Sequence, residues 1–109
     1  MPEQRLIVLC TVPDQAAGER IAAALVAERL AACVNILPQV TSVYRWQGQV
    51  ETDAELLMII KTRRRVYQRL EQRVVALHPH ELPEVIAVQI TDGLAGYLSW
   101  VDEMTDSSE

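Results

Sequence analysis

Apolar and β-branched residues gather in segments separated by polar ones, and their spacing predicts four β-strands. The first is the run from Arg5 to Thr11, which the Pro13-Asp14 pair ends and follows with a helix N-cap. The second extends from Cys33 to Trp46 and contains Pro38, so we expect a bend or an unpaired edge position there. The fourth is a shorter run from Val85 to Thr91.

The third strand, from Val50 to Thr62, is expected to form a long hairpin with the second. Gln47-Gly48-Gln49 separates the two strands and predicts a tight turn in which Gly48 takes a positive φ. The half of this strand from Leu56 to Ile60 is apolar at every position. We therefore expect that half to lie in the centre of the sheet and to be covered on both sides.

Three further segments carry apolar residues at helical spacing. From Gln15 to Leu30, the positions expected to face inward are Gly18, Ile21, Ala22, Leu25 and Val26. From Arg64 to Leu77, before the His78-Pro79 pair, they are Val66, Leu70, Val74 and Leu77. The polar tail from Thr105 to Glu109 is expected to fray. A short closing helix from Asp92-Gly93 onward carries Leu94, Tyr97, Leu98 and Val101.

The order strand, helix, strand, strand, helix, strand, followed by a C-terminal helix, predicts an α+β fold. This βαββαβ order is that of the ferredoxin-like split βαβ sandwich, in which two helices cover one face of an antiparallel sheet and leave the other bare. The chain has 109 residues, and 50% of them are hydrophobic, which suffices for the core of a single domain over residues 1–109.

The central β-hairpin is too long for this small domain to cover. It is expected to project by about 20 Å beyond the other two strands, and an isolated two-stranded projection is marginally stable in water. Pairing with neighbouring copies in a closed ring would bury its apolar surface. Alternatively, the hairpin curls onto its own domain with the C-terminal helix as cover. The apolar residues of the projection are Val43, Tyr44, Trp46 and Val50.

The charge balance and the apolar pattern exclude some classes of binding partner and favour one cellular location. Ten basic and fifteen acidic residues give a net charge of −5, which argues against nucleic acid. No uninterrupted apolar run approaches the ~18 residues of a membrane span or forms a signal segment, so we expect no membrane association and a cytoplasmic location. In that reducing compartment Cys10 and Cys33 are expected to be free thiols.

Several short motifs together resemble the CutA family of divalent-cation tolerance proteins, from the first strand to the closing helix. The resemblance implies a ferredoxin-like fold and a tight homotrimer built through long strands, similar to the PII signalling trimers. It also implies an association with copper and other divalent cations. The motifs are Leu9-Cys10-Thr11 with Pro13-Asp14, the run from Arg29 to Asn35, Ser42-x-Tyr44-x-Trp46-x-Gly48, the run from Leu57 to Thr62, His78-Pro79, Leu82-Pro83-Glu84 and Tyr97-Leu98-x-Trp100.

Two positions depart from the family pattern. The family often has a glycine after the proline of the second strand, where this chain has Gln39, so the bend at Pro38 is expected to differ. Some members place two histidines before the later proline and a tyrosine after it, and here Leu77 and His80 occupy two of those positions. If metal binding requires the doubled histidine, this chain has lost half of it.

The resemblance implies Cys10, Cys33 and His78 as metal ligands. Thiolate and imidazole together suit copper or another soft or borderline cation. The alternatives are structural: Cys10 lies in an apolar strand where a cysteine serves as a small buried hydrophobe, and His78 simply closes its helix. His80 offers a second imidazole next to His78.

Other clusters have competing interpretations. Glu51, Asp53 and Glu55 share one side of a strand and could bind a hard cation; the alternative is a solvated face or salt bridges to Arg45 across the hairpin. The run from Arg63 to Arg65 could hold a phosphate, but it lacks a glycine-rich loop, so a solvated helix start is favoured. The aromatic residues expected to anchor the core or an interface are Tyr44, Trp46, Tyr97 and Trp100.

No arrangement of serine, histidine and acid typical of a catalytic centre is found, so we do not expect an enzyme. The function favoured by the sequence is a homotrimeric protein that binds copper or another divalent cation and contributes to cation tolerance. One alternative is a PII-like trimeric signalling module that holds a small ligand in clefts between subunits, although PII trimers have a long loop where this chain has a three-residue turn. The other is a structural trimer without a ligand.

Overall fold

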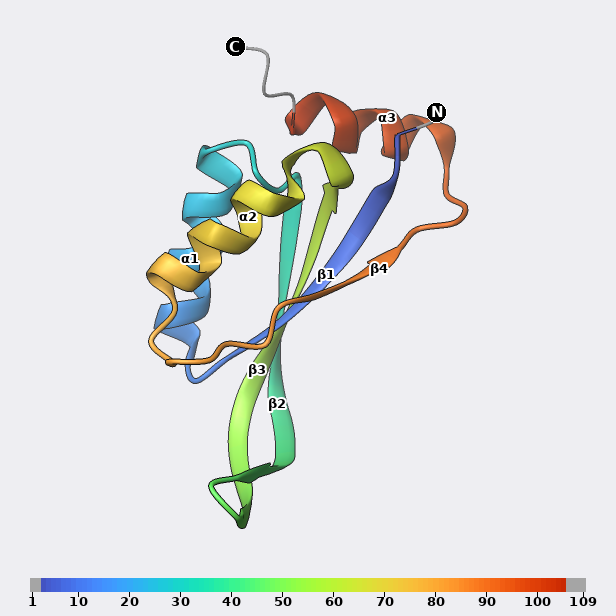
Figure 1. The fold of residues 1–109 in the computed structure, drawn as a ribbon. Coiled ribbons are helices and arrows are strands. Elements are labelled where there is room, and N and C mark those ends of the chain that lie inside the picture. Colours follow the sequence, from blue (N-terminus) through green and yellow to red (C-terminus); the bar gives the residue numbers. More distant parts are fainter. Residues whose placement is uncertain (1–2, 106–109) are drawn as a thin grey trace.

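The computed structural model describes residues 3–105, which form a four-stranded sheet with two helices on one face and a third helix at one end (Figure 1). The strands lie in the order β2-β3-β1-β4, and every neighbouring pair is antiparallel. The predicted α+β fold, βαββαβ with a C-terminal helix, is confirmed. The elements are β1 (Arg5–Val12), α1 (Gln15–Ala27), β2 (Cys33–Trp46), β3 (Gln49–Arg63), α2 (Arg64–Leu77), β4 (Ile86–Gln89) and α3 (Ala95–Met104).

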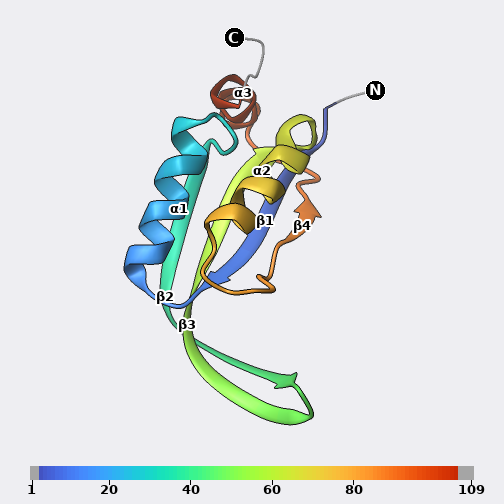
Figure 2. The same ribbon diagram turned by 60° about the vertical axis from the view of Figure 1, so that its left-hand side comes forward.

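The core lies between the sheet and the two long helices, α1 and α2 (Figure 2). Strand β1 alternates strictly: its even-numbered residues are buried and its odd-numbered ones are half-buried. Each fully buried aliphatic side chain contributes about 1.5–3 kcal/mol to stability. Strand β3 follows the same alternation, with Met58 and Ile60 buried and Leu57 and Ile59 only half-buried. The sequence predicted that residues 56–60 would be covered on both faces of the sheet. Within one chain, only the face toward the helices is covered.

Helix α1 begins as predicted and ends three residues early. Asp14 is its N-cap, and its side chain accepts a hydrogen bond of 2.8 Å from the Ala17 N–H. At the other end the Arg29 N–H donates to the Val26 oxygen and the Leu30 N–H to the Leu25 oxygen, which is a Schellman motif. Arg29 takes the left-handed conformation, with φ 61°, that glycine normally fills there. Val26, expected to face inward, is exposed.

The hairpin of β2 and β3 has the predicted turn and an irregularity near Pro38. Gln47 and Gly48 have φ values of 51° and 80° and connect the paired residues Trp46 and Gln49, as in a two-residue hairpin turn. The register of β2 shifts between Leu37 and Val40, which is a β-bulge on the edge strand. The bend predicted at Pro38 is confirmed.

Beyond the bulge the hairpin leaves the sheet and curves away from it, at the end opposite α3 (Figures 1 and 2). The chain is accordingly elongated, with extents of 44 × 26 × 22 Å. The alternative in which the C-terminal helix covers the hairpin is therefore wrong.

The last elements differ in extent from the prediction. Strand β4 is shorter than expected, although the Ile90 N–H still donates to the Arg5 oxygen. Helix α3 begins at Ala95, so Leu94 precedes it and is exposed. Thr105 is fully buried rather than frayed, and its hydroxyl donates to the Val101 oxygen at 2.7 Å; the rest of the predicted tail lies outside the described residues. None of the helices within residues 3–105 is long and apolar enough to cross a membrane.

The bulge generates a stability prediction, because Gln39 adopts a left-handed conformation, with φ 66°, in an exposed position. A side chain with a Cβ pays about 1–2 kcal/mol for this conformation, while glycine loses more entropy on folding. Gln39→Gly should raise the free energy of unfolding by about 0.5–1 kcal/mol, measured by denaturant titration at one protein concentration. Gln49→Gly, exposed in the same hairpin and free of positive φ, should lower it; a loss with both variants would contradict the prediction.

Candidate functional site

The two cysteines lie on opposite faces of the sheet. Cys10 pairs with Met58, and both are buried under the helices. Cys33 pairs with Lys61, which pairs in turn with Ile7 on the other face. Cys33 is thus also displaced from Cys10 along the strands by three residues, or about 10 Å. Both thiols are free, as predicted, and one chain cannot bring them to a shared metal ion.

Cys10 has the environment of a small hydrophobic residue. Its side chain is fully buried, and its Sγ makes only a long contact of 3.7 Å with the Thr11 carbonyl oxygen. Burial raises the pKa of the Cys10 thiol to about 12, with smaller contributions from the negative charges of Glu84 and Glu55. Because the thiolate is the form that binds metals, this environment opposes metal binding at neutral pH.

His78 uses both of its ring nitrogens within the fold. Its Nε2 lies 2.8 Å from the Thr11 carbonyl oxygen, and its Nδ1 accepts a hydrogen bond of 3.0 Å from the His80 N–H. These two contacts correspond to the tautomer in which Nε2 carries the ring proton and faces the Thr11 oxygen. His78 is also the C-cap of α2, so its predicted helix-closing role is confirmed. Its Nδ1 lone pair becomes available to a metal only if the hydrogen bond from His80 breaks.

Cys33 is half-buried on the sheet face that the helices do not cover. Burial raises the pKa of the nearby Tyr97 hydroxyl, and the charge of the Cys33 thiolate and a hydrogen bond between the two side chains add to the effect. Helix α3 therefore borders the Cys33 sulfur. The Tyr97 ring lies against that of Trp100, with ring centroids 5.5 Å apart. Both residues are exposed, so their predicted role in the core is wrong within one chain, and the interface role stays a prediction.

The acidic residues of the hairpin share one face with an aromatic residue. Tyr44 pairs with Glu51, and its hydroxyl donates to Asp53, which raises the pKa of Tyr44 to about 12. Arg45 pairs with Val50 and so lies on the opposite face. The predicted salt bridges from Arg45 to the acidic residues are therefore wrong, because the register separates them.

The face of Tyr44 and Trp46 borders two adjoining hollows. One has a volume of about 360 Å³ and is also lined by Pro79, His80, Glu81 and Leu82. The other, of about 250 Å³, is also lined by Thr11, Glu55, Leu82 and Glu84. Here the hairpin, the segment after α2 and the end of β1 come together. The contribution of Thr11 was not evident from the sequence, because it depends on which way β1 faces.

No group of three or more histidine, cysteine or acidic side chains within the described part of the chain is arranged to hold a metal ion. Cys10 faces the helices, Cys33 lies beside α3, and His78 contacts the Thr11 carbonyl oxygen near the end of β1. The ligands implied by the resemblance are thus distributed over separate places in a single chain. The aromatic and acidic hollow brings the acidic residues Glu55, Glu81 and Glu84 together with His80 beside an open volume.

Comparison with known proteins agrees with this fold over nearly the whole chain. A divalent-cation tolerance protein CutA from Thermus thermophilus is 52% identical over 99 residues, which cover 91% of this chain and 96% of that protein. A chloroplastic CutA 1 protein from Oryza sativa is 48% identical over 103 residues, and the match covers 94% of this chain but only 58% of that longer protein.

Solved structures show the same arrangement of elements. The crystal structure of CutA1 from Oryza sativa has a TM-score of 0.93 at 47% identity, with 96% of each chain covered. A CutA described as periplasmic, from Archaeoglobus fulgidus, has a TM-score of 0.91 at 36% identity, with 94% of this chain and 99% of that chain covered. A family model described as CutA1 divalent ion tolerance protein matches residues 6–104. The chain therefore belongs to the CutA1 family of divalent ion tolerance proteins.

Proposed function

We propose that this chain acts as a cytosolic homotrimer that contributes to divalent-cation tolerance by binding copper or another divalent cation. The observation that carries the proposal is the apolar surface of the uncovered sheet face. Ile86 and Val88 pair with Leu9 and Ile7 and so share their face, and both are more than half exposed. Leu37, Leu57 and Ile59 extend this surface across the other two strands.

A closed ring of copies accounts for both the bare face and the hairpin. The hairpin and the bare face are different surfaces of the chain. Each copy can therefore place its hairpin against the bare face of one neighbour and accept the hairpin of the other neighbour on its own bare face. Such head-to-tail contacts generate closed rings. Three copies is the ring size implied by the resemblance to trimeric families. Such a ring also allows ligands from different copies to meet, which the distribution of these side chains prevents within one chain.

Among the three predicted ligands, Cys33 has the surroundings that suit this proposal best. Its sulfur lies on the face that a ring would cover, and it is not sealed beneath the helices. Cys10 would have to lose its proton inside the core, and His78 would have to give up a hydrogen bond within its own loop. A cytosolic location would keep the Cys33 thiol reduced and able to bind copper.

The assembly is tested by two valine variants that differ in position but hardly in exposure. Val88 on the bare face is 52% exposed, and Val75 on the outer side of α2 is 53% exposed. Val88→Lys should shift the protein from trimer to monomer at micromolar concentration, because it places a charge in the proposed interface, whereas Val75→Lys should remain trimeric. Sedimentation velocity measures both. A wild-type protein that sediments as a folded monomer would remove the homotrimer proposal.

Copper binding is tested by titrating copper(I) into the reduced protein and its cysteine variants. Cys33→Ala should weaken binding at least tenfold, because it removes the accessible thiolate, and Cys10→Ala should change it by less than twofold. Circular dichroism and sedimentation confirm that each variant is folded and assembled. If Cys10→Ala causes the larger loss, Cys10 is the ligand and the core must open to bind copper. If the wild-type trimer binds neither copper(I) nor copper(II), the copper proposal falls while the assembly proposal stands, and the same titration with zinc tests the remaining divalent cations.

A further inference from the structure

The two hollows beside the hairpin share one wall. Tyr44, Trp46 and Leu82 line both of them, so the hollows adjoin along an aromatic and apolar surface. In Figure 2 the hairpin curves below the segment that connects α2 to β4, which carries Leu82. All three side chains are exposed, and volumes of about 360 and 250 Å³ suit a small ligand. The shared wall is therefore open to a ligand that contacts both hollows.

Each hollow also has acidic side chains. Glu81 lines the first, and Glu55 and Glu84 line the second. Within residues 3–105, no arginine or lysine forms an ion pair with any of the three. Burial is the main cause of the raised pKa of the Cys10 thiol, and the negative charges of Glu84 and Glu55 add to it. The negative potential of the second hollow therefore extends to the end of β1.

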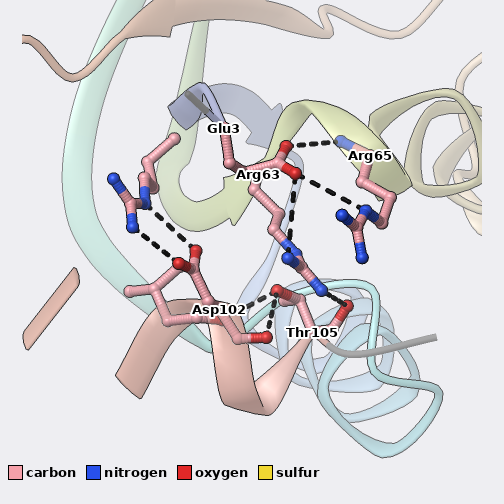
Figure 3. Close-up of polar contacts among 7 residues, drawn as sticks. Glu3, Arg63, Arg65, Asp102 and Thr105 are labelled. Carbon is pink, nitrogen blue, oxygen red and sulfur yellow. Dashed lines mark hydrogen bonds and ion pairs between the residues drawn. The ribbon is translucent and has the colours of Figure 1, made fainter. Parts of the chain in front are cut away.

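Arginine side chains gather at the other end of the sheet, near α3, where they already have partners. Glu3 Oε1 lies 3.5 Å from Arg65 Nε and 3.8 Å from Arg63 Nη1 (Figure 3). Arg63 is only 6% exposed, and its Nη2 donates to the Thr105 carbonyl oxygen at 3.1 Å, so the expected solvated helix start is wrong for this residue. Among the residues that line the two hollows, His80 alone can carry a positive charge.

The residues that line the hollows argue against two classes of ligand. A nucleotide or another phosphate is bound by cationic donors, and neither hollow is lined by arginine or lysine. A metal ion needs several ligands around one point, and the described part of the chain has no group of three histidine, cysteine or acidic side chains so arranged. Carboxylates spread along an aromatic wall instead suit an organic ammonium ion, which aromatic faces and carboxylates both attract.

We propose that the two hollows together form a binding site for an aliphatic diammonium ion, a short alkyl chain with an ammonium group at each end. The alkyl chain lies on the shared aromatic and apolar wall, one ammonium group faces Glu81, and the other faces Glu55 and Glu84. Such a ligand places positive charge in each hollow and apolar surface between the charges. The site uses neither Cys33 nor His78, so the proposal does not rest on copper binding.

The test is calorimetric titration of putrescine, a diammonium ion at neutral pH, into the full-length protein at constant ionic strength. Putrescine should bind saturably. n-Butylamine has the same carbon chain but a single ammonium group, so it should bind about tenfold more weakly, because it leaves the carboxylates of one hollow without a partner. Equal affinities for the two amines, or no saturable binding of putrescine, would overturn the proposal.

Three variants locate the site. Glu81→Gln should weaken putrescine binding about tenfold, because it removes a charge that faces the ligand with little change in shape. Glu19→Gln is the matched control: it removes an exposed carboxylate from α1 and should leave the affinity unchanged. Trp46→Leu keeps an apolar wall but removes the ring face, so it should weaken binding about fivefold, with folding and assembly checked by circular dichroism and sedimentation. An affinity that Glu81→Gln lowers no more than Glu19→Gln, or that Trp46→Leu leaves unchanged, would mean that putrescine only screens the net charge, and the proposal would fall.

Discussion

The strict alternation of β1 and β3 is the constraint on which the rest of the structure depends. Along β1 and along residues 58–62 of β3, every second residue is buried beneath α1 and α2, and the residues between them face a side that the chain does not cover. A strand cannot turn a single side chain to the other face without shifting its register, which would move all of its side chains. The division into a face covered by helices and an uncovered face is therefore a property of the whole sheet.

This division separates the groups that resemblance alone would assign to one metal site. Cys10 lies on the face covered by the helices, where burial raises the pKa of its thiol and keeps it protonated, and Cys33 lies on the uncovered face. His78 holds the end of β1 through the Thr11 carbonyl oxygen. Its imidazole therefore stabilises the junction between α2 and the sheet, which is a structural use of a residue whose type suggests metal chemistry.

The two ends of α2 carry opposite local charge. Arginines surround its N-terminus, and the hollow near its C-terminal end is lined by Glu55, Glu81 and Glu84. Both arrangements oppose the helix dipole, so neither is explained by helix stability alone. At the N-terminus Glu3 partly compensates. The Gln4 carbonyl oxygen also accepts a hydrogen bond from the Arg64 N–H, so contacts from the segment before β1 satisfy the start of α2 where its own sequence does not.

Periodicity in the sequence was sufficient to predict the element order, the fold class, the bounds of β2 and α2 and the turn at Gly48, because these depend on residues close together in the chain. Positions decided by distant contacts could not be read in this way. Arg29 and Gln39 occupy left-handed conformations that local preference assigns to glycine, and they do so because the surrounding packing and strand pairing impose them. The burial of Arg63 and Thr105 likewise depends on α3 meeting the end of β3. The alternating pattern determined by itself that this chain has an inner and an outer set of strand residues. Only the tertiary structure decided which candidate ligand belongs to which set, because that assignment depends on the register between strands far apart in the sequence.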